Sequence, residues 1–197
     1  MVAFNLTGDL DQMRRRHDLV QQLGGSCVMA SLNAIGLVGL LGLRRHSSLP
    51  IHGHRCGWGA LTRSPALGWD YAPWQSWRLA GADHLHVNGL RNKFSEPDAS
   101  VVAAVRAVQK PLFDHAPMSA MPVFSSGQTG LQAHGTWQTL GNADLIHAAG
   151  GGIFGHPGGI AAGVTAFRQA WSAAMADMPL SECAATHPEL RSALGFW

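Results

Sequence analysis

The chain has 197 residues, of which 46% are hydrophobic and 13% are charged, and its formal net charge is +2. This length can supply a sizeable core, and a charged share of roughly half the usual quarter argues against disorder, a coiled coil or a solvated helical bundle. The small net charge gives no nucleic-acid footprint, and three cysteines without metal-like spacing indicate reduced thiols in a cytoplasmic protein.

The hydrophobic residues do not form a membrane segment in the sequence. The apolar run Ala34–Leu43 is far shorter than the roughly 18 residues that a membrane span requires. No charged segment followed by an apolar one opens the chain, so the sequence shows no secretory signal. We therefore expect a cytoplasmic protein without membrane or nucleic-acid partners.

Short apolar runs bounded by Gly, Pro or Asn alternate with helix-like stretches along the chain, which predicts repeated βα units. We expect six strands, at Val2–Thr7, Cys27–Leu32, Leu49–Arg55, His84–Asn88, Met118–Ser125 and Ala143–Ala149. Helices are expected at residues 9–23, 34–45, 70–80, 98–110, 129–140 and 159–177, with a tail helix near 180–194.

The strand runs are apolar almost throughout, as a parallel sheet covered on both faces requires. Polar residues stand at the carboxyl ends of the runs, namely Asn5, His54, Arg55, His86, Asn88, Ser125 and Ser126. This distribution favours a TIM barrel over a doubly wound sheet, which would concentrate such residues at one switch point. Because a closed barrel needs eight βα units, we expect an incomplete TIM barrel over 1–178 that lacks the first two units, followed by the tail helix in 179–197.

Two pairs of histidines mark neighbouring strands. His52 and His54, and likewise His84 and His86, are two residues apart and therefore face the same side of their strands. The deeper pair, His52 and His84, is expected in the core, whereas His54 and His86 near the strand ends are candidates for acid–base catalysis or substrate contact. Arg55 can bind a phosphate or carboxylate, the alternative being a surface ion pair. The His-x-His pairs also leave a zinc hydrolase open as a weaker alternative.

A polar loop over residues 87–96 follows the fourth run and contains Gly89 and Lys93. Such a loop can close over a bound anion, with Gly89 as a hinge, and its lysine can neutralise a developing enolate or carboxylate. The alternative is a solvated lysine without a role in binding. We treat Lys93 as a candidate catalytic residue.

Two glycine-containing segments predict a phosphate site. Gly150, Gly151 and Gly152 follow the last strand run, and glycines continue to Gly159 at the start of the last long helix. Successive backbone N–H groups at a helix start bind phosphate, and barrels place this site after their last two strands. The preceding unit ends in Ser125, Ser126 and Gly127, which supply hydroxyl groups and a further backbone donor.

Taken together, in their order along the chain, the motifs described above resemble those of the large subunit of RuBisCO. They are His54-Arg55, Asp83-His-Leu-His86, Lys93, Ser125-Ser-Gly127, and Gly150-Gly-Gly152 followed by Gly155-His-Pro157. The resemblance implies phosphate contacts for Arg55, for His86 and for the backbone of Gly150 and Gly151. It also implies that His54 is an active-site histidine, that Ser125 contacts substrate, and that Lys93 closes over substrate and steadies its carboxylate.

Several positions depart from RuBisCO itself. Phe94-Ser95-Glu96 stands in place of Leu-Glu-Gly, Trp58 in place of a third histidine, and Ser31-Leu32-Asn33 in place of His-Asp-Tyr. Together with Asn88-Gly-Leu-Arg-Asn92, these departures resemble the RuBisCO-like proteins. The subgroup most resembled decarboxylates oxo-isoapionate phosphate or acts on it as a transcarboxylase/hydrolase.

The resemblance implies a carbon–carbon lyase that acts on a phosphorylated keto-sugar through a Mg²⁺-stabilised enediolate, and a homodimer in the full-length form. The family's magnesium ligands, which include a carbamylated lysine, would lie upstream of Met1, so no metal ligand is expected in this chain. Activity of this chain alone is therefore in question. The rival hypothesis is a truncated or split phosphate-binding fragment without catalysis.

Overall fold

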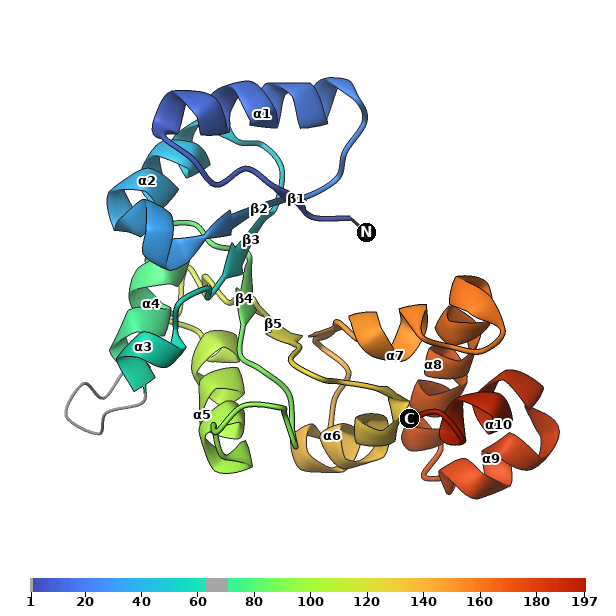
Figure 1. The fold of residues 1–197 in the computed structure, drawn as a ribbon. Coiled ribbons are helices and arrows are strands. Elements are labelled where there is room, and N and C mark those ends of the chain that lie inside the picture. Colours follow the sequence, from blue (N-terminus) through green and yellow to red (C-terminus); the bar gives the residue numbers. More distant parts are fainter. Residues whose placement is uncertain (1, 63–70) are drawn as a thin grey trace. The chain divides into compact units, whose positions relative to one another are not determined.

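The computed structural model describes residues 2–62 and 71–197 (Figure 1). Short strands follow one another in chain order and form a sheet in the order β1-β2-β3-β4-β5-β6. The pairs β1–β2, β2–β3, β3–β4 and β5–β6 are parallel. The strands are β1 Phe4–Asn5, β2 Val28–Ser31, β3 Ile51–His54, β4 His84–His86, β5 Met121–Phe124 and β6 Ile146–His147.

Helices connect successive strands, so the prediction of an α/β fold built from six βα repeats is confirmed. They are α1 Leu10–Gln22, α2 Leu32–His46, α3 Gly59–Thr62, α4 Tyr71–Leu79, α5 Asp98–Gln109, the 3₁₀ helix η2 Gly130–Gln132, α6 Ala133–Leu140, α7 Gly150–Phe154, α8 Gly159–Met175, α9 Leu180–Thr186 and α10 Pro188–Leu194. Of the predicted barrel region 1–178, residues 1 and 63–70 lie outside the described residues, and residue 70 is also the first residue of the predicted helix 70–80.

All six strands are shorter than the apolar runs predict, and for β1 and β5 the structure shows a local reason. After Asn5 the chain turns, because the Asn5 Oδ1 accepts a hydrogen bond from the backbone N–H of Thr7 at 3.0 Å. Before β5, Met118 has a φ of 44°, which is incompatible with extended backbone, so the strand begins only at Met121. Apolar runs therefore located the strands but overestimated their length.

The predicted tail helix near 180–194 is wrong as a single helix, because the chain forms α9 and α10 with a break at His187. His187 has a φ of −119° and a ψ of 98°, and Pro188 begins α10. A residue before proline is pushed out of the helical region, and proline is favoured in the first helical position. The boundary between a barrel region and the tail at residue 178 stays a prediction.

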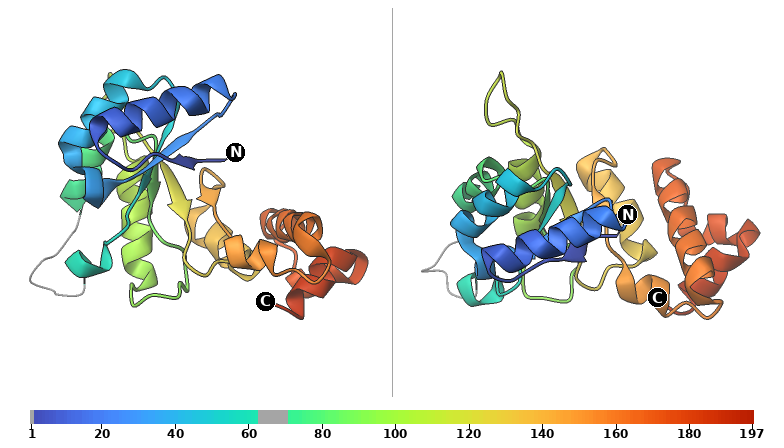
Figure 2. Two further views of the ribbon diagram at one scale, coloured as in Figure 1. Left: turned by 45° about the horizontal axis from the view of Figure 1, so that its top comes forward. Right: turned by 90° about the horizontal axis from the view of Figure 1, so that it is seen from above.

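The chain divides into two compact units, Met1–His86 with Ala103–Pro122, and Val87–Val102 with Val123–Trp197. In the first unit, α2 contacts β2 and β3, and α1 packs against α2 (Figure 2). The strand residues Val28, Ala30, Ile51 and Leu85 are fully buried there. Burial of such apolar strand side chains contributes roughly 1.5–3 kcal/mol for each large residue, and this fixes the strands against their helices.

In the second unit, α8 is the central helix and contacts α6, α7, α9 and α10. Its buried alanines pack with side chains of the tail helices in one core, which contains Ala133, Ala170, Ala173, Ala174, Cys183, Ala184 and Leu190. Small side chains let the helices approach closely, and larger partly buried residues such as Trp171 and Trp197 close the edges of this core.

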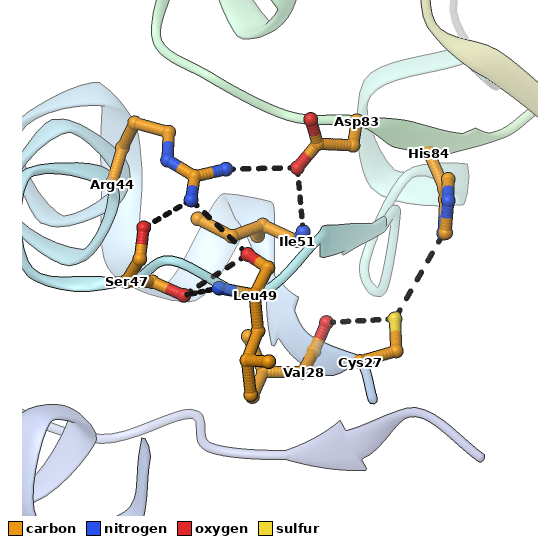
Figure 3. Close-up of polar contacts among 8 residues, drawn as sticks. All are labelled: Cys27, Val28, Arg44, Ser47, Leu49, Ile51, Asp83 and His84. Atoms are coloured by element: carbon orange, nitrogen blue, oxygen red, sulfur yellow. Dashed lines mark hydrogen bonds and ion pairs between the residues drawn. The ribbon is translucent and has the colours of Figure 1, made fainter. Parts of the chain in front are cut away.

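A polar network stabilises the amino-terminal ends of β3 and β4 in the first unit (Figure 3). The Asp83 Oδ2 accepts hydrogen bonds from the backbone N–H of Ile51 at 2.7 Å and from the Arg44 Nη1 at 2.9 Å. Arg44 also donates to the backbone carbonyls of Ser47 and Leu49. Asp83 therefore has a structural role that joins α2 to two strands, although it belongs to the Asp-His-Leu-His segment.

None of the helices in the described part of the chain is long and apolar enough to cross a membrane. All three cysteines are free thiols, with Cys27 and Cys183 buried and Cys56 exposed. The Cys27 Sγ lies 3.9 Å from the Nδ1 of His84 (Figure 3), so His84 contacts the buried Cys27, although His84 itself is only partly buried.

Candidate active site

The four predicted histidines gather at β3 and β4 in the first unit. His54 and His86 end these strands, and β-pairing places His52 opposite His84. The Nε2 atoms of His52 and His86 are 2.5 Å apart, and the ring centroids of His54 and His86 are 4.5 Å apart. His52 is buried, as expected of a core histidine, while His54 and His86 keep partial exposure.

Burial keeps these imidazoles neutral. It lowers the pKa of His86 to about 2, with the neighbouring His52, His54 and Arg55 charges adding to the effect, and it lowers the pKa of His52 to about 4. The pKa of His54 is lowered by burial and then by Arg55. A neutral imidazole has one lone pair and one N–H, so His54 can accept a proton or a hydrogen bond from a substrate hydroxyl at neutral pH.

The short His52–His86 contact joins two neutral rings, so one Nε2 carries a proton and donates a hydrogen bond that the other Nε2 accepts. The His52 Nδ1 is buried without a hydrogen-bond partner in the described residues. Because an orphaned N–H costs more than an orphaned lone pair, we place the His52 proton on Nε2, as the donor to His86. His52 thus orients the ring of His86.

Arg55 is buried, with 8% of its surface exposed, so its side chain does not lie on the protein surface. Its guanidinium carbon lies 4.9 Å from the centroid of the Trp58 ring, an arrangement typical of cation–π contact. Trp58, which stands where RuBisCO has a histidine, is itself buried and holds this cation. A fixed guanidinium of this kind can bind an oxyanion with two parallel hydrogen bonds.

Lys93 lies on the loop after β4, in the second unit, and its side chain is exposed. Its backbone N–H donates to the carbonyl of Ser126 at 3.1 Å. The Ser126 hydroxyl donates to the Asn88 Oδ1 at 2.7 Å, and the Asn88 side-chain amide donates to the Glu96 Oε2 at 2.6 Å. This network fastens both ends of the lysine loop to the segment that follows β5.

The residues after β5 adopt backbone conformations that L-amino acids rarely take. Ser126 has a φ of 73° and Gly127 has a φ of 80°. A Cβ atom at Gly127 would lie 3.2 Å from the Cβ of Lys93, so the lysine stem passes directly beside this glycine. Strained backbone of this kind persists where surrounding contacts enforce it, and it is common at functional sites. Ser125, with its hydroxyl 3.3 Å from that of Ser126, completes this segment.

The predicted phosphate glycines form the first turn of a short helix, α7, and the last long helix begins only at Gly159. Gly150 and Gly151 are exposed, and open space surrounds the position of an added Cβ atom. Their N–H groups lie in the first turn, where no carbonyl of the helix can accept them. Gly152 is buried against Thr129, and its carbonyl accepts a hydrogen bond from the Trp197 indole at 2.9 Å.

Sequence reasoning missed the roles of Asn88, Glu96 and Gln128 in holding the loop. Gln128 is 2% exposed and its amide donates to the carbonyl of Leu90 at 3.1 Å. In the sequence, Asn88 is one of the strand-end polar residues and Glu96 is one of the departures from the RuBisCO motif. Their partnership spans eight residues of irregular loop, where no periodicity indicates which side chains meet.

The donor set at the ends of the described strands does not fit magnesium. Mg²⁺ requires hard oxygen ligands, above all carboxylates, whereas these strand ends present imidazoles, hydroxyls and amides. The carboxylate of Asp9, after β1, caps α1 by accepting from the Gln12 N–H, and that of Glu96 accepts from Asn88. The described strand ends therefore do not offer the set of carboxylates that magnesium would need.

Residues 1–197 match the family model described as ribulose bisphosphate carboxylase large chain, catalytic domain. The chain belongs to this RuBisCO family. It is 70% identical over 198 residues to a 3-oxo-isoapionate-4-phosphate transcarboxylase/hydrolase of Xanthobacter autotrophicus, a match that covers 100% of this chain and 48% of that protein. A 3-oxo-isoapionate-4-phosphate decarboxylase of Rhizobium rhizogenes is 47% identical and is covered over 47% of its length.

Solved RuBisCO-family structures have the same fold. A RuBisCO-like protein from Burkholderia fungorum superposes with a TM-score of 0.95 at 47% identity, over 100% of this chain and 49% of that one. An archaeal RuBisCO from Hyperthermus butylicus, described as dimeric, gives a TM-score of 0.84 at 29% identity and covers 99% of this chain and 49% of that one. This chain spans about half the length of the curated relatives it matches.

Proposed function

We propose that this chain carries the phosphate-binding and loop-lysine part of a RuBisCO-like enzyme that acts on a phosphorylated 3-oxo sugar acid. The substrate class follows from two relatives, a transcarboxylase/hydrolase and a decarboxylase of 3-oxo-isoapionate 4-phosphate. The observation that carries the proposal is the anchored loop that presents Lys93 beside the strained Ser126–Gly127 backbone. A cation held in this way can be positioned against a reacting carboxylate or enolate.

The reaction class follows from the chemistry of a 3-oxo acid. When the bond between the carboxyl carbon and the adjacent carbon breaks, its electron pair passes toward the 3-oxo group and CO₂ leaves, so negative charge develops as an enolate, which is an enediolate where that adjacent carbon carries a hydroxyl group. Lys93 is proposed to stabilise this charge or that of the departing carboxylate. The neutral imidazole of His54 is proposed to take up and return the proton of a substrate hydroxyl, and His86, oriented by His52, is proposed to contact the substrate.

Two sets of groups are proposed to bind the phosphorylated substrate. In the first unit this is the buried guanidinium of Arg55. In the second unit these are the hydroxyls of Ser125 and Ser126 and the backbone N–H groups of Gly127, Gly150, Gly151 and Gly152. Binding energy from a phosphate remote from the reacting carbon can be used to orient that carbon.

Mg²⁺ is proposed as the cofactor of the full-length enzyme, bound by residues outside this chain and supplying charge stabilisation when present. A cytoplasmic homodimer is proposed for the full-length form, in line with the dimeric and octameric RuBisCO structures among the similar proteins. A non-catalytic or split phosphate-binding fragment is the second candidate, because the chain spans about half of its relatives. The strand-end histidines form no three-ligand metal group in the described residues, so no geometry favours a zinc hydrolase.

The test is CO₂ release from 3-oxo-isoapionate 4-phosphate, with Mg²⁺ present, by the gene product that contains this chain. We expect Lys93→Met to lower kcat about 100- to 1000-fold, the loss typical of removing one charge-stabilising donor. Lys110→Met is the matched control, because Lys93 and Lys110 are the only lysines in the sequence. Tight substrate binding without CO₂ release or hydrolysis would favour the non-catalytic candidate, and equal effects of the two substitutions would exclude the role of Lys93.

A further inference from the structure

A cluster of possible metal ligands joins two helices of the first unit, apart from the strand ends. His17 and Asp18 lie in α1, and His46 is the last residue of α2. The Asp18 Oδ1 lies 3.0 Å from the His17 Nδ1 and 2.6 Å from the His46 Nε2. In residues 2–62 and 71–197, this is the one group of three His, Cys, Asp or Glu residues whose ligand atoms all lie within 4.8 Å of one another.

We propose that His17, Asp18 and His46 form a binding site for a zinc-type divalent cation. Two imidazole nitrogens and one carboxylate oxygen are a donor set that Zn²⁺ accepts in tetrahedral sites, with water in the fourth position. Ligands at zinc distances lie about 3.3 Å from one another in a tetrahedron. The observed separations are shorter by less than 1 Å, so a small rotation of the carboxylate opens the site.

Exposure of two of the ligands gives an ion access from solvent. The Asp18 side chain is 51% exposed and that of His46 is 32% exposed, whereas His17 is 1% exposed and forms the floor of the site. His17 and His46 meet edge to face, with ring centroids 5.1 Å apart. Two of the three ligands can therefore adjust to the ion while the third is held by packing against the helices.

The environment of His17 sets an expectation for the strength of binding. The Nε2 of His17 is buried without a hydrogen-bond partner in the described residues. When a cation takes the Nδ1, the ring proton must move to this nitrogen, where no acceptor receives it. Partners of that second nitrogen typically account for 10- to 100-fold in metal affinity, so we expect this site to be weaker by about that factor than one with such a partner.

Binding would also have a structural effect, since the ion would connect the middle of α1 to the carboxyl end of α2. These helices already pack against each other. A ligand that binds only the folded state raises the midpoint of thermal unfolding in proportion to the logarithm of its concentration. Zinc is therefore expected to raise the melting temperature of this protein in a concentration-dependent manner.

Equilibrium dialysis against ZnCl₂ tests the proposal, with Co²⁺ as a second probe whose visible absorption reports nitrogen and oxygen ligands. We expect about one ion per chain, an affinity at least about tenfold lower in His46→Gln and in Asp18→Asn, and no change in the control His115→Gln. His46→Cys should keep zinc binding, since a thiolate replaces one ligand with another. The amide of His46→Gln can still donate a hydrogen bond to Asp18 and so keep the contact between the two helices. A loss of zinc affinity in this variant therefore reports the loss of a metal ligand and not of the helix contact.

Three outcomes would overturn the proposal. The first is wild-type protein that retains no zinc after dialysis. The second is zinc affinity in His46→Gln and Asp18→Asn equal to that of the wild type. The third is loss of zinc on replacing His54 with Gln instead, which would assign the ion to the strand-end histidines.

Discussion

Replacing Asn88 with glycine should loosen the loop that carries Lys93. Asn88 is 4% exposed, and its side chain connects the Ser126 hydroxyl to the Glu96 carboxylate. Its φ of 64° lies in the left-handed region, which glycine adopts without strain. The substitution Asn88→Gly therefore removes the two hydrogen bonds and leaves the backbone conformation accessible.

The size of the effect follows from the two contacts. A hydrogen bond to a charged carboxylate contributes about 1.5–3 kcal/mol and a neutral one about 1 kcal/mol. Because Ser126 and Glu96 regain some water when Asn88 is removed, we expect a net loss of about 2–3 kcal/mol in the local opening free energy. This corresponds to roughly 30- to 150-fold less protection from hydrogen exchange if the loop opens locally. Asn88→Ala should lose about 1 kcal/mol more, since alanine resists a positive φ.

The assay is hydrogen exchange of the Lys93 amide, which donates to the Ser126 carbonyl at 3.1 Å. A urea titration of the same samples separates local opening from global unfolding. Asn142→Gly is the matched control, because the hydrogen bonds of the Asn142 side chain are local: it donates to the carbonyl of Leu140 and accepts from the backbone N–H of Asp144. Unchanged exchange at Lys93 in Asn88→Gly would refute the inference that these contacts hold the loop, whatever the effect on activity.

Three further predictions concern stability. Arg78 is 1% exposed and donates to the backbone carbonyls of residues 107, 110, 117 and 118. The substitution Arg78→Met should therefore lower the unfolding free energy, measured in urea titrations, by about 3–5 kcal/mol. A loss below about 1 kcal/mol would contradict this expectation. Burial lowers the pKa of His52 and of His147 from 6.5 to about 4. Between these pH values only the unfolded chain takes up protons on these histidines. Their contribution to the unfolding free energy is therefore complete above pH 6.5 and is lost as the pH falls toward 4. Stability measured across this window should fall by up to about 1.4 kcal/mol per pH unit for each histidine, and His147→Gln should reduce the slope. A Cβ at Gly89 would lie 2.1 Å from the buried Gln128 side chain, so Gly89→Ala should lower the melting temperature, whereas Gly135→Ala, with open space around the added methyl, should not.

The sequence predicted the parts of the fold that depend on local pattern. Apolar runs and their spacing located six strands and the helices between them, because a strand buried on both faces requires an uninterrupted apolar run. The strand ends were less accurate, since an Asn5 side-chain turn and a positive φ at Met118 stop extended backbone within apolar sequence. The break between α9 and α10 has a local cause in the sequence, because Pro188 disfavours the helical conformation of His187, but the pattern of apolar residues predicts one continuous helix.

The candidate site was predicted by residue type at strand ends, and these residues do lie there. His54, His86 and Arg55 follow from their places at the ends of two strands, and Lys93 from its polar loop. The protonation state of these histidines could not be predicted from the sequence, because the low pKa of His86 depends on burial among residues that are far apart in the sequence. The same holds for the partnership of Asn88 with Ser126, which are 38 residues apart.

What the sequence determined by itself is the order of strands and helices and the chemistry at the strand ends, because the alternation of apolar and polar residues acts over a few neighbours. Only the tertiary structure decided which distant side chains meet. It brought His46 to Asp18 across 28 residues, and it placed Arg78 on carbonyls 29 to 40 residues away. Such contacts form only after helices have packed, since closing a long segment costs conformational entropy that a single hydrogen bond does not offset, and buried apolar surface must supply the difference.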